Sequence, residues 1–239
     1  MALRSIKFIA EDEETLQNVE LPSPAVKNTP DWYKHASRFI DSNSVTFGEN
    51  GEPLGTMKGC IPVLDSITHG YIQKTWTDIY IERDSEGEIT YRWSRGPEIM
   101  RTRDAYQYQT MPTVNGYDKR MFTWNRPWGV ITPPGYSVLF THPMYRYDLP
   151  FMSQPGIIDS DVYHAAGKNS VPFFLKEGFT GLIPAGTPMY QIIPIRRDEW
   201  HATGHGSEFS QIKDDTSRLL RSKIYDGYKK LFWQRKSFS

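Results

Sequence analysis

The feature that most constrains the fold of this chain is a series of short apolar runs between residues 57 and 200, separated by proline and glycine. Alternation of apolar and polar residues over four to eight positions is typical of half-buried strands. The strands predicted in this way are Ala105–Thr110, Arg120–Trp124, Gly129–Thr132, Tyr136–His142, Gly156–Tyr163, Val171–Leu175, Thr180–Ile183 and Met189–Ile195. So many short strands predict an antiparallel sandwich or barrel.

A hairpin is the clearest local signal. Tyr71–Arg83 and Glu88–Ser94 both alternate, and Asp84-Ser85-Glu86-Gly87 between them has the composition of a tight turn. Nearer the start of the chain, Ser5–Ala10 predicts a first strand. Pro30–Lys34 predicts a short helix with proline in its first turn.

The end of the chain has a different periodicity. Between Ser210 and Trp233 the apolar residues fall at helical spacing and charges fill the other positions, which predicts an amphipathic helix. We therefore expect an N-terminal strand and irregular arm over residues 1–56, a β-rich core over 57–200, and a loop with a basic amphipathic helix over 201–239. The fold class is mainly β, with helical additions.

The charge of the chain sums to zero, with 28 basic and 28 acidic residues. Strong binding to nucleic acid needs a basic excess, so none is expected. One cysteine excludes an internal disulfide, and no apolar run is long enough to span a bilayer, so we expect a protein made in the cytoplasm and no membrane partner.

The net charge is zero because an acidic first part of the chain offsets a basic second part. Residues 1–100 carry 10 basic and 16 acidic groups, and residues 101–239 carry 18 and 12. Such asymmetry favours packing of the two halves on each other or association of one copy with another. The basic side chains expected to contact an acidic partner surface are Arg218, Arg221, Lys229, Lys230, Arg235 and Lys236.

Most catalytic and metal-binding patterns are missing from the sequence. There is no zinc-binding motif, phosphate-binding loop or Gly-x-Ser-x-Gly, and the His201–His205 segment contains a glycine that disfavours a helix. We therefore expect no metal and no cofactor. Trp124 and Trp128 favour a β core, or alternatively a small-ligand site in a barrel mouth.

One constellation does carry chemistry. Asp159 and Asp161 follow a strand. If this segment is extended, the two side chains share a face and one raises the pKa of the other. An Asp on such a turn can act as a general base, and turn-forming Asp is also common for structural reasons. The alternative to a structural role has Asp159 as base, with Gln191, Tyr163 and His142 around the pocket.

This order of motifs resembles dUTPases and the related dCTP deaminases, over about residues 136–195. There a Gly-x-Ile-Asp-x-Asp turn, here Gly156–Asp161, precedes a Gly-x-x-x-x-Gln strand, here Gly186–Gln191. The resemblance implies a β-clip fold, usually a homotrimer, and Mg²⁺ under the enzymatic alternative. Where those enzymes have a phosphate-binding Arg-Ser-Gly, this chain has Thr141–Arg146.

A second resemblance covers roughly residues 30–200. The blocks Pro30–Lys34, Ile61–Ile72, Pro134–Pro143 and Leu182–Pro188 are similar to an uncharacterised family in bacterial and tailed-phage genomes. This resemblance implies phage origin and no particular activity. We therefore expect a non-enzymatic, self-associating β-rich protein, a capsid, decoration, neck or tail component that contacts itself and other virion proteins. The alternatives are a divergent nucleotide-handling enzyme and a small-ligand binding module.

Overall fold

The computed structural model describes residues 4–40, 45–49, 54–164, 170–204, 209–221 and 227–239, and the side chains of Leu220 and Arg221 lie outside this description. The chain divides into two compact units. The first consists of Met1–Asn28, Gly70–Arg197 and Ser239, and the second of Thr29–His69 and Asp198–Phe238.

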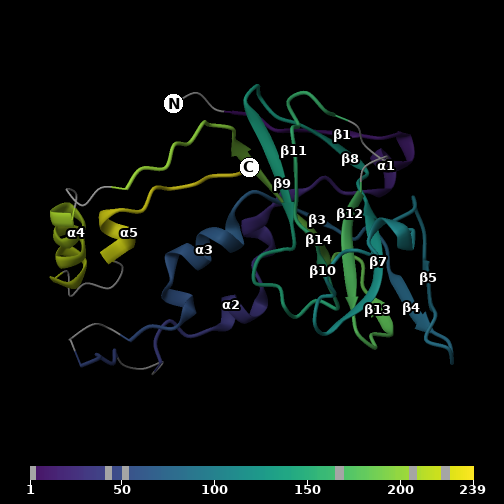
Figure 1. The fold of residues 1–239 in the computed structure, drawn as a ribbon, viewed down its shortest axis with the longest axis horizontal. Coiled ribbons are helices and arrows are strands. Elements are labelled where there is room, and N and C mark those ends of the chain that lie inside the picture. Colours follow the sequence, from purple (N-terminus) through teal and green to yellow (C-terminus); the bar gives the residue numbers. More distant parts are fainter. Residues whose placement is uncertain (1–3, 41–44, 50–53, 165–169, 205–208, 222–226) are drawn as a thin grey trace. The chain divides into compact units, whose positions relative to one another are not determined.

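The first unit is built from antiparallel sheets of two, four, five and three strands (Figure 1). In order of pairing these are β1 (Lys7–Ala10) and β8 (Trp128–Ile131); β10 (Phe151–Ser153), β12 (Ser170–Lys176), β7 (Tyr117–Asn125) and β6 (Met100–Thr102); β11 (Gly156–Ile158), β9 (Tyr136–Thr141), β14 (Pro188–Arg196), β3 (Tyr71–Lys74) and β2 (Ser23–Pro24); and β13 (Gly181–Ile183), β4 (Ile79–Arg83) and β5 (Ile89–Trp93). The prediction of a mainly β fold with helical additions and a C-terminal helix is confirmed. In the part of the chain that is described, these sheets do not close into a barrel.

Aromatic residues fill the core beside the four-stranded sheet. Phe122 and Trp124 lie two residues apart on β7 and so share a face, and β12 places Phe173 opposite Phe122. The ring of Trp124 stacks on that of Phe173 with centroids 3.8 Å apart, and Phe151 of β10 meets Trp124 edge-on. All four side chains are fully buried, so this cluster supplies much of the apolar burial that stabilises the unit.

β14 is the central strand of the five-stranded sheet. It pairs with β9 on one side and β3 on the other, so that Gln191 lies opposite both Thr141 and Ile72. Its residues from Pro188 to Ile193 are all buried, which explains the almost continuous apolar run in this part of the sequence.

The predicted hairpin is present, although its first arm is shorter than expected. β4 and β5 pair from Ile79↔Trp93 to Arg83↔Ile89, and the Asp84 carboxylate accepts hydrogen bonds from the backbone N–H groups of Glu86 and Glu88. Tyr71–Arg83 is not one strand: it forms β3 and β4, which belong to different sheets. The alternation of apolar and polar residues continues from β3 into β4, so the sequence pattern did not reveal the end of the first strand.

The second unit is helical in its described part. Its helices are α2 (Asp31–His35), η2 (Met57–Gly59), α3 (Ile61–Thr68), α4 (Phe209–Arg221) and α5 (Gly227–Leu231). The buried Tyr33 ring packs near Lys58 and donates a hydrogen bond to the Lys58 carbonyl, and the Trp233 indole donates to the Asp65 carboxylate. These contacts join α2 to η2 and the C-terminal segment to α3.

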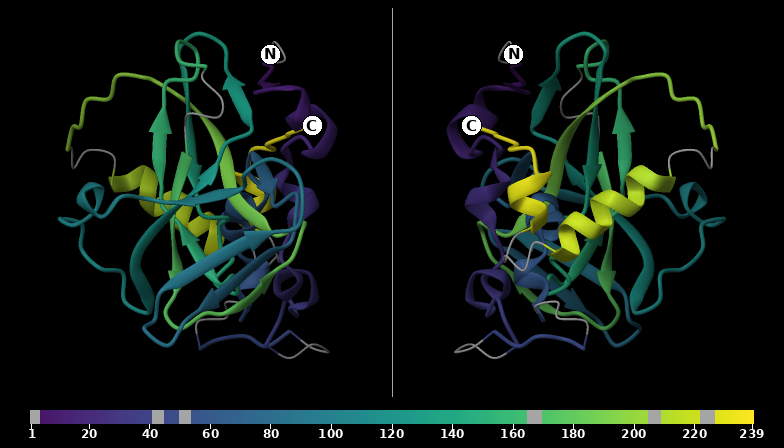
Figure 2. Two further views of the ribbon diagram at one scale, coloured as in Figure 1. Left: turned by 90° about the vertical axis from the view of Figure 1, so that its right-hand side faces the viewer. Right: turned by 90° about the vertical axis from the view of Figure 1, so that its left-hand side faces the viewer.

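Several other predictions need correction. Ala105–Thr110 is not a strand but begins with the 3-10 helix η3 (Ala105–Gln107), and the strand predicted to run to Tyr163 ends at Ile158. The acidic stretch after β1 forms α1 (Glu13–Asn18), which is followed by the 3-10 helix η1 (Ala25–Asn28). Figures 1 and 2 show α4 and α5 within the predicted C-terminal helix, and residues 222–226 between them lie outside the described residues.

Gly70 permits the chain to enter β3 beside β14. Its φ is +73°, and a Cβ at this position would lie 2.1 Å from the Ile192 carbonyl oxygen, a backbone atom that cannot move aside alone. Gly87, in the hairpin turn, has a similar φ of +82° with nothing within 4 Å. Both glycines have a positive φ, but only Gly70 has a close neighbour. Comparing substitutions at the two positions therefore separates the cost of backbone strain from the cost of steric overlap.

We predict that Gly70→Ala destabilises the first unit much more than Gly87→Ala. The left-handed conformation alone costs an L-residue about 1–2 kcal/mol, which sets the expected loss for Gly87→Ala. Overlap with Ile192 adds about 1–3 kcal/mol or more at Gly70. Urea unfolding of the two variants measures the difference, and equal losses would contradict this account of the β3–β14 junction.

Candidate functional site

The Asp159–Asp161 turn closes the edge of the five-stranded sheet. β11 pairs with β9 up to Ile158↔Val138, and the chain then turns, with the N–H groups of Val162 and Tyr163 both donating to the Asp159 carbonyl. Ser160, between the two carboxylates, is buried, and its hydroxyl lies 2.7 Å from that of Thr132. A tight turn with an anchored centre holds both Asp side chains in place.

Both carboxylates meet one guanidinium, that of Arg197. Arg197 contacts Asp161 through two nitrogens, at 2.9 and 2.5 Å, and reaches Asp159 at 3.3 Å. The Ser137 hydroxyl donates to Asp159 at 2.6 Å and accepts from Arg197 at 3.0 Å. The N–H of Gly135 donates to Asp161 at 2.8 Å. We call these five residues the Arg197 cluster.

The cluster changes the expected electrostatics of the turn. Because Arg197 binds the Asp161 carboxylate in bidentate fashion and Gly135 adds a backbone hydrogen bond, the pKa of Asp161 falls to about 2. The expectation that one Asp raises the pKa of the other is therefore wrong for Asp161. A cation faces the pair, and its attraction outweighs the repulsion between the carboxylates.

Gln191 and His142 lie away from the Asp turn. Asp159 bonds to Ser137, whereas Gln191 lies opposite Thr141, four residues further along β9, or about 13 Å at strand spacing. The Gln191 side chain is buried and its Oε1 accepts from the Met144 N–H. The residues predicted to surround one pocket therefore lie at two separate places on the sheet.

His142 has both ring nitrogens engaged by backbone groups. Nδ1 accepts from the Ser153 N–H at 3.2 Å, so Nε2 carries the proton and donates to the Arg146 carbonyl at 3.0 Å. Burial lowers the pKa of His142, in keeping with this neutral form. Its ring positions the segment between β9 and β10.

The aromatic candidates fall into two groups. Trp124 belongs to the core described above and donates from Nε1 to the Ser153 hydroxyl; Trp128 is buried on β8 and donates to the Glu20 carbonyl. Neither lines a barrel mouth in the described part of the chain. Tyr163, by contrast, is 47% exposed directly after the Asp turn.

The basic residues of the C-terminus lie in the second unit. Arg218 is on α4, Lys229 and Lys230 are on α5, and all three are exposed, as is Arg235. Lys236 is bound to the Asp65 carboxylate at 2.5 Å. Arg221 ends α4, with its side chain outside the described part.

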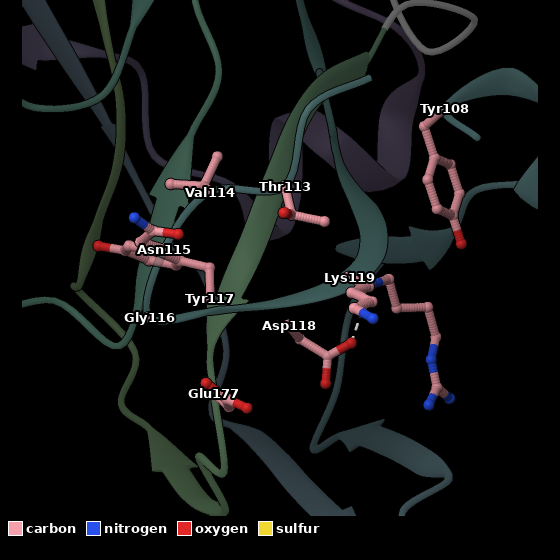
Figure 3. A pocket seen from close by; sticks show the side chains of 10 residues that line it. Tyr108, Thr113, Val114, Asn115, Gly116, Tyr117, Asp118, Lys119 and Glu177 are labelled. Atoms are coloured by element: carbon pink, nitrogen blue, oxygen red, sulfur yellow. Dashed lines mark hydrogen bonds between the residues drawn. The ribbon is translucent and has the colours of Figure 1, made fainter. Parts of the chain in front are cut away.

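A pocket of about 580 Å³ lies elsewhere in the first unit, around the loop that leads into β7. Figure 3 shows Tyr108 on one side and Asn115 with Tyr117 on the other. Two of the charged side chains that line it are paired, because Asp118 binds Arg83 at 2.8 Å and Arg120 binds Glu88 at 2.7 Å. None of the site residues predicted from the sequence lines this pocket.

Two further features bear on the kind of site. Across the described ranges no three His, Cys, Asp or Glu side chains gather as ligands for a metal ion, and of the His201–His205 segment the second histidine is outside those ranges. The helices within the same ranges are too short or too polar to cross a bilayer.

No protein-family model matches the sequence, and no curated protein matches it either. Function must therefore be argued from the residues themselves. Sequence reasoning identified the two carboxylates but missed Arg197 and Ser137. The sequence signal for Arg197 is its place two residues after the end of the last predicted strand.

We predict that the Arg197 cluster loses its stabilising effect in acid. The pKa of Asp161 is about 2 in the folded protein against 3.8 for a free carboxyl group, so its contribution to stability is present above about pH 4 and disappears as the pH falls toward 2. Asp161→Asn should therefore be less stable than the wild type at pH 6, with the difference shrinking below pH 4.

The measurement is thermal unfolding of both proteins between pH 6 and pH 2. Asp104→Asn is the control, since the exposed Asp104 side chain makes no capping hydrogen bond at the start of η3. A constant difference between wild type and Asp161→Asn across this range would contradict the role given to Asp161.

Proposed function

We propose that this chain is a non-enzymatic protein that assembles with copies of itself as a structural component of a larger particle. The resemblance to a family from bacterial and tailed-phage genomes favours a tailed-phage virion as that particle. The observation that carries the proposal is an apolar face of α4 that the chain itself leaves exposed.

That face is continuous along the helix. At 100° per residue, Phe209, Ile212, Thr216 and Leu219 fall within an arc of about 80°. Phe209 and Ile212 are 69% and 64% exposed. Asp214 and Arg218 lie on the opposite side of α4. An amphipathic helix whose apolar stripe faces solvent is a surface suited to docking.

The second unit offers little core of its own. In its described part the buried apolar side chains are only Tyr33, Ile61, Val63 and Ile67. Large apolar side chains that remain exposed in its C-terminal segment are Trp200, Phe209, Ile212, Leu219, Tyr228 and Leu231. A unit with so small a core gains stability when this segment is covered.

A second copy of the chain suits this surface. Two copies of α4 packed antiparallel bury their apolar stripes against each other, in a self-complementary contact. A net charge of zero places no overall repulsion between the copies.

The Arg197 cluster supports a structural role for the Asp turn. A general base must be free to take a proton from the reacting group, and the enzymatic alternative gives this role to Asp159. Asp159 is held by Ser137 and Arg197, and Gln191 by Met144. These contacts favour the non-enzymatic proposal over the nucleotide-handling alternative.

We predict that Ile212→Asp converts the assembly to monomers. A charge in the centre of the apolar stripe is costly to bury in the contact between copies. Ser210→Asp is the matched control, because it adds the same charge to the same helix about 140° from the centre of the stripe. Native mass spectrometry at micromolar concentration measures the change and distinguishes a dimer from the trimer implied by the β-clip resemblance.

The outcome depends on both variants. Assembly in the wild type and in Ser210→Asp, with monomer in Ile212→Asp, is the expected result. A wild type that is monomeric at all salt concentrations would overturn the proposal. Assembly that survives Ile212→Asp would show that α4 is not the contact.

The enzymatic alternative is tested separately. With a panel of nucleoside triphosphates and Mg²⁺, we expect no turnover above that of the buffer, because both carboxylates of the turn are bound within the Arg197 cluster. Turnover in the wild type that is lost in Asp159→Asn would contradict the non-enzymatic proposal and make Asp159 the base.

A further inference from the structure

A polar cleft lies in the first unit, between the end of α1 and the end of β3. Its main part, of about 360 Å³, is lined by residues that include Gln73, Lys74, Trp76 and Arg95. An adjoining part of about 170 Å³ is reached past Gly96 and shares Asn18, Trp76 and Arg95 with the first. No residue of the Arg197 cluster takes part in it.

Trp76 forms an aromatic wall of this cleft. It is half-buried, and its Nε1 donates to the Pro97 carbonyl at 3.1 Å, which fixes the orientation of the ring. Gly96 lies against the ring edge, where an added Cβ would be 3.4 Å from Trp76 Cδ1. The indole is thus held in place while part of it lines open space.

Arg95 supplies an unpaired cation beside the ring. Its backbone N–H donates to the Thr77 hydroxyl, which anchors the residue at the rim. Within the described ranges its guanidinium has neither a hydrogen-bond nor an ion-pair partner, whereas the other cation of the cleft, Lys74, lies 3.3 Å from Glu20. The guanidinium is therefore available to an anionic group.

Gln73 adds a buried side-chain oxygen that lacks a hydrogen-bond donor among the described residues. Its Nε2 donates to the carbonyls of Glu20 and Lys74, which fixes the identity of the two amide atoms. Its Oε1 is buried and accepts no hydrogen bond from the described residues, although the side chain is only 2% exposed. Buried acceptors are normally satisfied, so this oxygen requires a donor such as a water molecule beside the cleft.

We propose that this cleft binds a small aromatic anion, a planar ring joined to a phosphate or carboxylate. The ring lies against Trp76, and the anionic group binds the Arg95 guanidinium. Pockets of this size hold small ligands, and arginine binds planar or tetrahedral anions through two parallel hydrogen bonds. The site is independent of α4 and of self-association.

Isothermal titration calorimetry with phenyl phosphate tests both halves of the proposal. Inorganic phosphate provides the anion without the ring, and phenol the ring without the anion. Phenyl phosphate is expected to bind at least about ten times more tightly than either fragment, as follows when two contacts act together. Phenylacetate in a parallel titration shows whether a carboxylate serves in place of the phosphate.

Variants assign the binding to the cleft. Loss of a hydrogen bond to a charged group weakens binding by about ten-fold or more, and this is the effect expected for the exposed Arg95→Ala. Arg92→Ala is the matched control: it removes an arginine three residues away that pairs with Glu82 outside the cleft. Thermal unfolding of each variant establishes that it is folded.

Three outcomes would overturn the proposal. These are no measurable binding of phenyl phosphate or phenylacetate, affinity equal to that of the isolated fragments, and equal binding by Arg95→Ala and the wild type. A loss confined to Arg95→Ala supports the site whatever the oligomeric state of the protein.

Discussion

The first unit depends on the pairing of β14 with two strands from distant parts of the chain. β9 and β3 bind its two edges, so the six residues from Pro188 to Ile193 are buried in the middle of the sheet. Two local adjustments make this possible. The Ile192 carbonyl needs a glycine at position 70, and the buried Gln191 amide needs the Met144 N–H. Each removes a clash or an unsatisfied polar group that would otherwise oppose the pairing.

The same pairing produces the Arg197 cluster. Arg196 lies opposite Tyr136 at the end of β14, so the next residue reaches the Asp turn that follows β11 on the far side of β9. The Arg197 N–H also donates to the Gly135 carbonyl. The chain therefore leaves the first unit at a point fixed by backbone and side-chain bonds together. This gives the two aspartates a structural task that requires no substrate.

The sequence predicted those parts of the fold in which local pattern and environment agree. The alternating runs of β5, β9, β12 and β14 are half-buried or fully buried strands and were found within one or two residues. α3 was missed because Ile61–Thr68 is short and rich in β-branched residues, which carry no clear helical signal. α1 carries a readable signal, since Asp12 caps the N–H of Thr15, but its six residues are too few to show a period.

The site was predictable only in part, for a related reason. The sequence identified Asp159 and Asp161 as a pair of neighbouring carboxylates. Their common partner Arg197 lies 36 residues beyond Asp161, and it is brought to them by the strand register between β9 and β14. Similarly, Trp76 and Arg95 come together only because β4 and β5 fold back on each other, since the Ser94 N–H bonds to the Asp78 carbonyl. The sequence shows which side chains can carry charge or stack, whereas strand register determines which of them come into contact.

The two units differ in the size of their apolar cores. In the first unit the carboxylates of the Asp turn, His142 and Gln191 are all bound by neighbouring residues, and the rings of Phe122, Trp124, Phe151 and Phe173 form a buried core. In the second unit the described apolar core is small, and α4 presents Phe209 and Ile212 to solvent. An apolar stripe of this kind is stabilising only when it is covered. We therefore place the proposed contact between copies in the second unit and the proposed ligand site, beside Trp76, in the first.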